Sequence, residues 1–248
     1  LSKLLEKNIS QIKIKSNQKI ITKTRYVDEY SKQKLYQINS NEIKNNKNND
    51  NYILNVSNFI KKNKNKYDGF IFFDYGYNLF EGELLKLINI LERKKIYINC
   101  QTNSYNYGFN LFTKFKKSKL VCVDDMEYRL AMKLQKGVID INTLKSHTSK
   151  IKQYQNLIIT QGRSGSLHFD KKNISRHFSI MQKTTDTIGC GDIFFTLYAL
   201  MDISRIFSLD EKMLFSHCAA GLHAAEFSNN LTLNRNYLMN VVSSILKV

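Results

Sequence analysis

The stretch TTDTIGCGDIFFTLYAL, residues 184–200, places two glycines around a cysteine, immediately before an acidic residue and an apolar run. Only 10 of the 248 residues of the chain are glycine, so this spacing raises a question about its purpose. Glycine permits positive φ and close approach to a ligand, and the apolar run predicts a helix with a glycine-rich first turn. Because the first N–H groups of a helix have no intrahelical partner, such a turn can hold an anion.

The composition indicates one sizeable folded domain. Of the residues, 42% are hydrophobic and 12% are aromatic, which is enough to bury a core. No segment approaches the roughly 18 uninterrupted apolar residues of a membrane span, and the N-terminus lacks the apolar core of a signal peptide. We therefore expect a soluble, cytoplasmic protein without a membrane partner.

The formal net charge of +17 raises the hypothesis of nucleic-acid binding, because clustered Lys and Arg neutralise phosphates. Here the charge is dispersed along the chain. Its densest runs, residues 42–50 and 59–68, are polar and poor in aromatics, which favours a solvated loop and helix face. Nucleic acid therefore stays open only as an alternative partner.

The cysteines predict reduced, buried thiols. They fall singly on predicted elements, without a C-x-x-C pair or a dense disulfide framework, at Cys100, Cys122, Cys190 and Cys218. His217 and His223 do not complete a zinc site, since six residues of helix turn them about 240° apart.

Strand and helix signals alternate along most of the chain. Apolar runs predict four buried strands at residues 69–75, 95–100, 119–124 and 156–162. Helical patterns predict helices at residues 52–62, 79–93, 109–115, 127–136, 143–153, 189–201, 209–227 and 234–247. Two hairpins are expected, at 20–27 with 34–39 before a loop at 41–50, and at 165–169 with 174–180. This order implies an α/β fold with a mostly parallel central sheet between two helical layers.

Three motifs fall where ligands bind in such sheets, beyond the carboxyl ends of the strands. In VDDMEYRLA, Asp124 ends a strand and Glu127 opens a helix. In TQGRSG, Gly162 and Gly165 flank a turn after a strand, and the third motif is the GCGD of the opening stretch. One short glycine motif recurs by accident, but three in this order indicate a ligand site.

These motifs resemble those of the ribokinase-like, or PfkB, carbohydrate kinases. The late D-T-x-G-A-G-D signature of that family is matched, with Cys190 in the place of alanine, at Asp186, Thr187, Gly189, Gly191 and Asp192. The family motifs N-x-x-E and V-T-x-G-x-x-G are similar to residues 124–127 and 159–165. TKTR at 22–25, FDYG at 73–76 and VDDMEYRLA look most like the heptose-phosphate kinase branch, the kinase domain of ADP-heptose synthase.

The resemblance implies a three-layer α/β/α kinase fold that transfers the γ-phosphate of ATP, with Mg²⁺, to a hydroxyl of a sugar or sugar phosphate. It implies that Asp192 is the general base and that the helix start at Gly189, Cys190 and Gly191 holds the phosphate. On spacing alone, a partner for the helix dipole explains Asp192 equally well.

The resemblance also assigns nucleotide contacts, at Thr160, Gly162, Gly165, Cys218 and Gly221. It places Mg²⁺ at Glu127 and Asp124, through water. The alternatives for these residues are an ordinary turn, core packing on a helix, and acids in a first helical turn.

Three further residues have weaker assignments. Asp186 resembles the family aspartate associated with a potassium ion. Lys23 and Arg25 lie two apart on one predicted strand, so they face one side and are candidates for binding a sugar phosphate. Solvent-facing strand charges are the alternative for both.

The chain departs from the family pattern at its beginning. It starts with Leu1 and has no G-G-A-x-x-N-type sugar-binding stretch, so we expect one kinase-like domain over residues 1–248 that lacks its N-terminal part. In addition, Asp124 stands where asparagine is commoner. Three alternatives stay open: an inactive nucleotide-binding homologue, a basic nucleic-acid-binding protein, and a piece of a bifunctional kinase and nucleotidyltransferase. A homodimer is also compatible with the resemblance.

Overall fold

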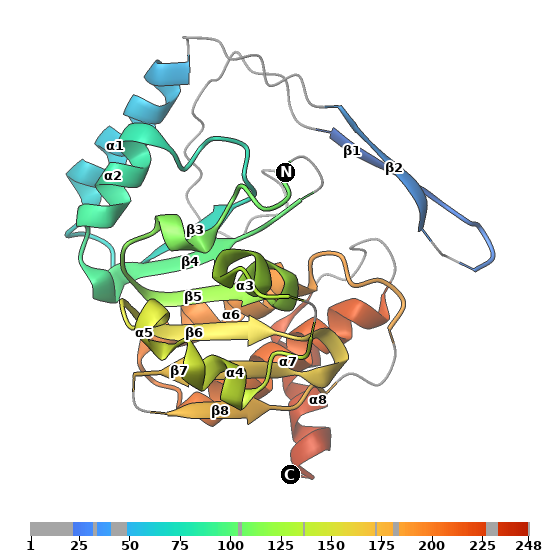
Figure 1. The fold of residues 1–248 in the computed structure, drawn as a ribbon. Coiled ribbons are helices and arrows are strands. Elements are labelled where there is room, and N and C mark those ends of the chain that lie inside the picture. The colour runs from blue at the N-terminus through green and yellow to red at the C-terminus, as the bar shows by residue number, and fades with distance from the viewer. Residues whose placement is uncertain are drawn as a thin grey trace.

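The computed structural model describes residues 22–31, 34–40, 49–103, 106–135, 137–171, 173–180, 184–226 and 233–247. Within these ranges the chain forms two separate sheets, with helices around the larger one (Figure 1). The loop predicted at residues 41–50 lies mostly outside the described residues. Its last two residues belong to a helix, because α1 begins at Asn49.

The larger sheet has six strands in sequential order. Its first four strands are parallel and correspond to the four predicted buried strands: β3 Phe70–Asp74, β4 Ile96–Cys100, β5 Ser118–Asp124 and β6 Tyr154–Thr160. The other two are antiparallel and form the predicted hairpin: β7 Ser166–Asp170 and β8 Ile174–His177. The prediction of a mostly parallel sheet is confirmed, and the carboxyl ends of β3 to β6 share one edge.

Helices cover both faces of this sheet, which confirms the predicted three-layer α/β/α fold class (Figure 1). One face carries α1 Asn49–Asn63, α2 Gly82–Ile90, α3 Asp125–Met132, α4 Ile141–Ser146 and α5 Thr148–Ile151. The other carries α6 Cys190–Ser204 and α7 Leu209–Ala225, with α8 Arg235–Leu246 packed on α7. The described residues also include the 3₁₀ turns η2 Arg93–Lys95, η3 Phe112–Lys114 and η4 Gly162–Ser164. Among the helices described here, none has the length and apolar character needed to cross a bilayer.

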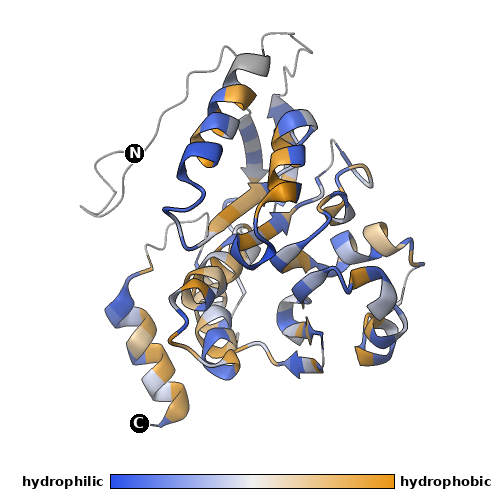
Figure 2. Cartoon of the chain, turned by 90° about the vertical axis from the view of Figure 1, so that its left-hand side faces the viewer, coloured by the Kyte–Doolittle hydropathy of each residue, from blue (hydrophilic) through white to orange (hydrophobic). Residues whose placement is uncertain are grey.

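The alternation of side chains along the strands divides the core into two layers. On β5, Leu120 and Cys122 point toward α6 and α7, whereas Val121 and Val123 point toward the opposite helices. All four side chains are at most 1% exposed. A strand buried on both faces needs apolar residues at every position, which explains the continuous apolar runs in the sequence. In Figure 2, α1 and α2 show hydrophilic and hydrophobic segments in alternation, as expected for helices with one face on the core.

The smaller sheet is the predicted N-terminal hairpin, formed by β1 Thr22–Val27 and β2 Lys34–Ser40. Tyr26 and Tyr36 stack across it with ring centroids 4.4 Å apart. The hairpin extends beside the carboxyl edge of the larger sheet (Figure 1). Lys23 Nζ lies 5.6 Å from the centre of the Tyr77 ring, so the hairpin contacts the segment that follows β3.

Three predicted helices are shorter or broken. The helix expected at residues 143–153 is interrupted at His147, where the His147 ring and the Ser146 hydroxyl each lie 2.8 Å from the Thr143 carbonyl oxygen. Polar side chains that bond nearby backbone compete with helical hydrogen bonds, so α4 and α5 form instead of one helix. The helix expected at 109–115 is only the turn η3, and the one expected at 79–93 is confined to α2.

Candidate active site

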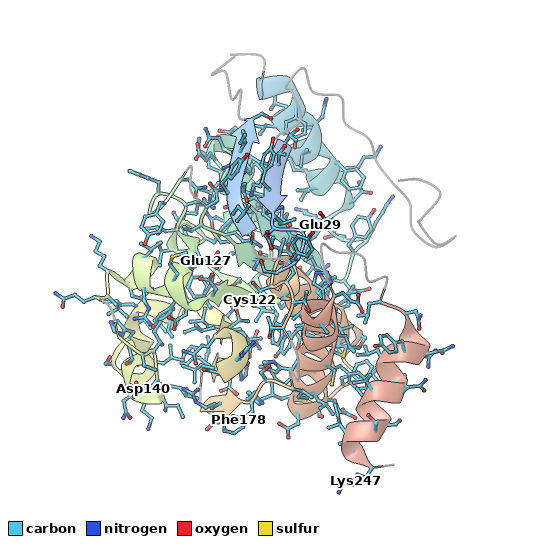
Figure 3. The ribbon with its side chains drawn as sticks, turned by 90° about the vertical axis from the view of Figure 1, so that its right-hand side faces the viewer. Glu29, Cys122, Glu127, Asp140, Phe178 and Lys247 are labelled. Atoms are coloured by element: carbon cyan, nitrogen blue, oxygen red, sulfur yellow. The ribbon has the colours of Figure 1, made fainter. Side chains whose placement is uncertain are left out.

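A pocket of about 360 Å³ opens at the carboxyl edge of the parallel strands. Its walls come from the ends of β4, β5 and β6, from the starts of α3 and α6, and from the middle of α7. Figure 3 looks onto this edge and shows Cys122 and Glu127 near the middle of the molecule, below the hairpin. All three sequence motifs reach the pocket, through Asp124, Glu127, Thr160, Gly162, Gly165, Gly189, Cys190, Gly191 and Asp192.

The start of α6 leaves backbone donors open toward the pocket. Gly189, the N-cap residue, has a φ of 83° and no side-chain cap. Within the described residues, the N–H groups of Gly191 and Asp192 have no acceptor. A Cβ atom added to Gly191 would meet nothing within 4 Å, so the space in front of these donors is free. Open N–H groups at the positive end of a helix dipole favour an anion such as a phosphate.

Asp192 projects from the first turn of α6 and is held by two side chains. Gln101 donates from Nε2 to Oδ1 of Asp192 at 2.5 Å, and the Tyr75 hydroxyl is a second donor. Burial raises the pKa of the Asp192 carboxyl, while the bonds from Gln101 and Tyr75 and the charge of Lys23 oppose this rise. An oriented, partly desolvated carboxylate is suited to accept a proton from a hydroxyl group.

Gln101 and Tyr75 are site residues that the sequence analysis missed. Each directly follows a parallel strand, Tyr75 after β3 and Gln101 after β4. Asp74 and Cys100 are partners in register, and Gln101 N donates to Asp74 O at 2.8 Å, which brings the two segments together. A polar residue directly after a buried strand is therefore the signal that could have identified them.

A buried ion pair fixes the turn that carries Tyr75. Asp74 is 1% exposed, and its Oδ2 lies 2.5 Å from Lys114 Nζ. Its Oδ1 accepts the N–H of Gly76 at 2.9 Å. Removing either charge would leave the other one buried without compensation, so this pair holds the end of β3 in one position.

Asp124 and Glu127 form a reciprocal capping box at the start of α3. Asp124 Oδ1 accepts the N–H of Glu127, and Glu127 Oε2 accepts the N–H of Asp124, both at 2.7 Å. The second oxygen of Glu127, Oε1, accepts the N–H of Thr102 at 2.9 Å. Burial raises the pKa of both carboxyl groups. In the described part of the chain, no three His, Cys, Asp or Glu side chains are grouped so as to hold a metal ion.

The turn after β6 brings backbone rather than long side chains to the pocket. Gly165 has a φ of 87°, and a Cβ atom there would lie 2.0 Å from the His177 carbonyl oxygen, so the position requires glycine. A Cβ atom on Gly162 would meet nothing within 4 Å. Thr160 lines the pocket, although its hydroxyl donates back to the Val123 carbonyl at 3.4 Å. The space in front of Gly162 is therefore open to a ligand.

Helix α7 lines the pocket with His217, Ala220 and Gly221. Cys218, which was predicted to contact the nucleotide, does not belong to this lining and packs with Leu238 of α8. Helical geometry explains its position, because residues three and four apart share a face while Cys218 is turned about 100° from its neighbour.

His217 makes a buried polar contact on the pocket face of α7. Its Nε2 lies 3.0 Å from the Ser166 hydroxyl, and its ring packs edge-on against Phe194. Burial lowers the pKa of His217 to about 4, with a smaller contribution from His177. The ring is therefore neutral near pH 7.

Asp186 shapes the turn before α6 and is absent from the pocket lining. Its Oδ1 accepts the N–H of Ile188 at 3.0 Å, and its own N–H donates to the Ala224 carbonyl at 3.1 Å. The first bond lies within the turn, and the second ties the turn to α7. The residues that follow, Thr187 and Gly189, then line the pocket.

The hairpin residues predicted to bind a sugar phosphate, Lys23 and Arg25, lie outside the pocket lining. Lys23 is half-buried against Tyr77, and its charge lowers the pKa of Asp192. Arg25 is exposed and is the register partner of Gln37 on β2. The structure thus connects Lys23, rather than Arg25, with the mouth of the pocket.

Comparison by sequence finds no matching family profile and no matching curated protein. Solved structures do match. Phosphofructokinase-2 from Escherichia coli in complex with fructose-6-phosphate aligns with a TM-score of 0.63 at 12% identity, over 90% of this chain and 70% of that one. The same enzyme in complex with substrates and products aligns with a TM-score of 0.52 at 15% identity, over 67% of this chain and 52% of that one. Arabidopsis thaliana ribokinase complexed with ribose and ATP aligns with a TM-score of 0.54 at 14% identity, over 64% of this chain and 51% of that one.

The extent of these alignments limits what they establish. The chain spans about half the length of the second and third structures, at 52% and 51%. At identities of 12 to 15%, these matches establish the fold and not the activity. On this basis, the chain shares the fold of the ribokinase-like carbohydrate kinases.

Proposed function

We propose that this protein is an ATP-dependent phosphotransferase that acts on a hydroxyl group of a sugar or sugar phosphate. The observation that carries the proposal is the position of Asp192, a carboxylate in the first turn of a helix whose N–H donors are open to a pocket. A base and an anion site thus share one location. Phosphoryl transfer to an alcohol uses both, since catalysis depends on positioning and on stabilising charge at the phosphoryl group.

In the proposed reaction, Asp192 accepts the proton of the acceptor hydroxyl while the oxygen of that hydroxyl bonds to the γ-phosphorus. The bond from that phosphorus to the bridging oxygen breaks, and ADP leaves with this oxygen. The N–H groups of Gly191 and Asp192 would stabilise the oxygens of the transferred group. Gln101 and Tyr75 hold the Asp192 carboxylate in one orientation, which favours proton transfer.

The proposed nucleotide position lies between the turn after β6 and the middle of α7. Gly162 leaves open space at the strand end, and Ala220 and Gly221 are small residues on the facing helix. Small residues let a ligand approach the backbone closely. With the nucleobase between the turn after β6 and α7, the phosphates would extend toward Gly191 at the start of α6.

The carboxylates of Asp124 and Glu127 fit a magnesium ion held through water, and they fit direct coordination poorly. Both oxygens of Glu127 already accept backbone N–H groups, so an inner-sphere bond would compete with one of them. Asp124, Glu127 and Asp192 line one pocket, and their like charges favour a cation there. When bound, Mg²⁺ would keep several waters and neutralise charge on the nucleotide phosphates.

The acceptor would lie on the side of the pocket bordered by Gln101 and Tyr75. Two cations of β1 favour an acceptor that carries its own phosphate, such as a heptose phosphate. They are Lys23, which lies near Tyr77, and Arg25, which lies further along the strand. Potassium is the proposed ion at the turn of Asp186, because this residue resembles the family aspartate associated with that ion.

The experiment that tests this function is an assay of ADP formation with ATP and Mg²⁺ against heptose phosphates, hexose phosphates and free sugars. Thermal melts with and without ATP and Mg²⁺ accompany it, because a ligand that binds the native state raises the apparent stability. We expect an ATP-dependent rise in the melting temperature and ADP formation with at least one acceptor.

Two other outcomes would replace the proposal. ATP binding without ADP formation from any acceptor would indicate a nucleotide-binding homologue. A melting temperature unchanged by millimolar ATP and Mg²⁺, together with heparin retention that disappears at modest salt, would indicate a basic nucleic-acid-binding protein.

A further inference from the structure

A second cleft, of about 440 Å³, lies at the opposite edge of the larger sheet. Lys119 near the start of β5 and Asn156 near the start of β6 contribute to it, whereas the first pocket lies at the ends of these strands. We call it the distal cleft, and its lining is Arg93, Lys119, Gln155, Asn156, His168, Asp170, Lys171, Tyr198, Asp202, Leu209 and Lys212. Both openings are lined by residues of α6 and α7, but they lie at opposite edges of the sheet.

Positive charge exceeds negative charge in the distal cleft, with four Lys or Arg side chains against two Asp. Asp202 binds two of the cations, since Oδ1 lies 2.7 Å from Lys212 Nζ and Oδ2 lies 3.8 Å from Lys119 Nζ. The Tyr97 hydroxyl also donates to Asp202, at 2.8 Å. One carboxylate thus serves two ammonium groups, and these are held in place with side chains only 13% and 23% exposed.

Two further donors of the distal cleft have no polar partner within the described residues. The guanidinium group of Arg93, a half-buried residue of η2, takes part in none of the ion pairs or side-chain hydrogen bonds found there. Tyr198 is 2% exposed, yet its hydroxyl makes no hydrogen bond in that part of the chain. The hydroxyl oxygen is not among the buried polar atoms without a partner, so it is accessible from the cleft. The Tyr198 ring stacks on Phe194 and lies 5.3 Å from Lys212 Nζ, which fixes its direction.

We propose that the distal cleft binds a small phosphorylated molecule, with its phosphate held by Arg93, Lys119 and Lys212 and by the Tyr198 hydroxyl. A guanidinium fork and preplaced ammonium groups match the geometry and charge of a phosphate. The rest of the lining is mainly polar, with Leu209 as the one aliphatic residue, so a polyol or sugar part fits better than a nucleobase. This site is separate from the proposed catalytic pocket and does not depend on the proposed function.

The test is a calorimetric titration of the protein with inorganic phosphate and with glycerol 3-phosphate, at ionic strength matched with potassium chloride. Comparison of the two probes separates binding of the free ion from recognition of a phosphate ester. Arg93→Gln should weaken binding about tenfold, and Tyr198→Phe should weaken it about threefold to tenfold, as expected for a charged and a neutral hydrogen bond. Neither substitution removes a polar partner of another described residue, so both variants should fold.

Two matched controls identify the site. Lys94→Gln removes an equal charge from the residue next to Arg93, outside the lining of the distal cleft, and should leave binding unchanged. Gly191→Val blocks the anion site at α6 and should also leave binding of these probes at the distal cleft unchanged. The proposal is overturned if neither probe binds, if Arg93→Gln and Lys94→Gln weaken binding equally, or if only Gly191→Val abolishes it.

Discussion

Two consecutive helices of the same layer, α6 and α7, begin in opposite ways. At the start of α7, Ser208 Oγ accepts the N–H of Glu211 at 3.3 Å, and Glu211 Oε2 accepts the N–H of Ser208 at 2.7 Å. At the start of α6, Gly189 offers no side-chain oxygen. A side-chain cap stabilises a helix by about 1 kcal/mol relative to alanine but by only a few tenths of a kcal/mol relative to glycine, so the open start of α6 costs the free protein little. The comparison teaches that the uncapped start is the one where a ligand can supply the acceptor.

The start of α3 extends this comparison within the pocket itself. Asp124 and Glu127 face the pocket, but their capping box already serves the first N–H groups of α3. The acids of α3 therefore have a structural role at the helix start, whatever they bind in addition. The acid of α6 caps nothing and is held by Gln101 and Tyr75 instead. An anion is thus expected at α6, and a cation beside α3.

The largest expected effect concerns Asp192. It distinguishes a general base from a carboxylate that only complements the dipole of α6. Asp192→Asn keeps size and polarity but removes the base, so turnover should fall by about 100-fold or more while ATP binding persists. Asp210→Asn removes a carboxylate from the first turn of α7, outside the pocket, and should leave turnover unchanged. Steady-state rates of ADP formation for both variants give the answer. If Asp192→Asn turns over like the wild type, Asp192 only complements the dipole.

The next effect tests whether the open start of α6 holds the nucleotide phosphates. Gly191→Val places a branched side chain in the free space before the donors and should weaken ATP binding about tenfold or more, while leaving the fold intact. Cys190→Ala is the matched control, because it changes the neighbouring residue without filling that space. Calorimetric titration with ATP measures both. Equal affinities in the two variants would contradict the anion site.

The fold could be predicted because its signals are local. Each strand from β3 to β6 contains an apolar run that packs against helices on both faces of the sheet, and the helices between them repeat at helical spacing. The break at His147 could not be predicted from periodicity, because it depends on where the side chains of Ser146 and His147 bond. Local competition with the backbone overrode the helical pattern there.

The candidate site was predictable only where a motif is contiguous in the chain. Residues 189–192 carry the helix start and its acid together, so the motif could be recognised in the sequence and, with the two other motifs, indicated a ligand site. Gln101 lies 91 residues from Asp192 and meets it only through the order of the strands. The position of Cys218 outside the pocket lining could not be predicted, because a run of small residues does not show which face of α7 turns to the pocket.

The third prediction concerns His217, which lines the pocket from the middle of α7. Burial lowers the pKa of this histidine to about 4, below the value near 6.5 expected in the unfolded chain. Between these values the unfolded state binds more protons at this residue, so the contribution of His217 to the free energy of unfolding is constant above about pH 7 and falls as the pH drops toward 4. At pH 5 the loss should be about 1 to 2 kcal/mol for this residue.

Denaturant unfolding at pH 7.5, 6 and 5 measures this dependence in the wild type and in His217→Gln. The variant should show a smaller loss between pH 7.5 and pH 5, whatever its stability at neutral pH. His168 is a second buried histidine whose pKa is lowered to about 4, so His168→Gln should reduce the slope independently. Parallel curves for wild type and both variants would mean that these rings do not stay neutral in the folded protein.

The smallest effect returns to the capped start of α7. Ser208→Ala removes the hydroxyl that accepts the N–H of Glu211, and the free energy of unfolding should fall by about 1 kcal/mol. Binding of ATP should not change, because this helix start lies outside the pocket lining and its donors meet no ligand there. Denaturant midpoints and ATP titrations measure the two quantities separately. A weakened ATP affinity in Ser208→Ala would show that both helix starts respond to the ligand, and the division between an open and a capped start would then be wrong.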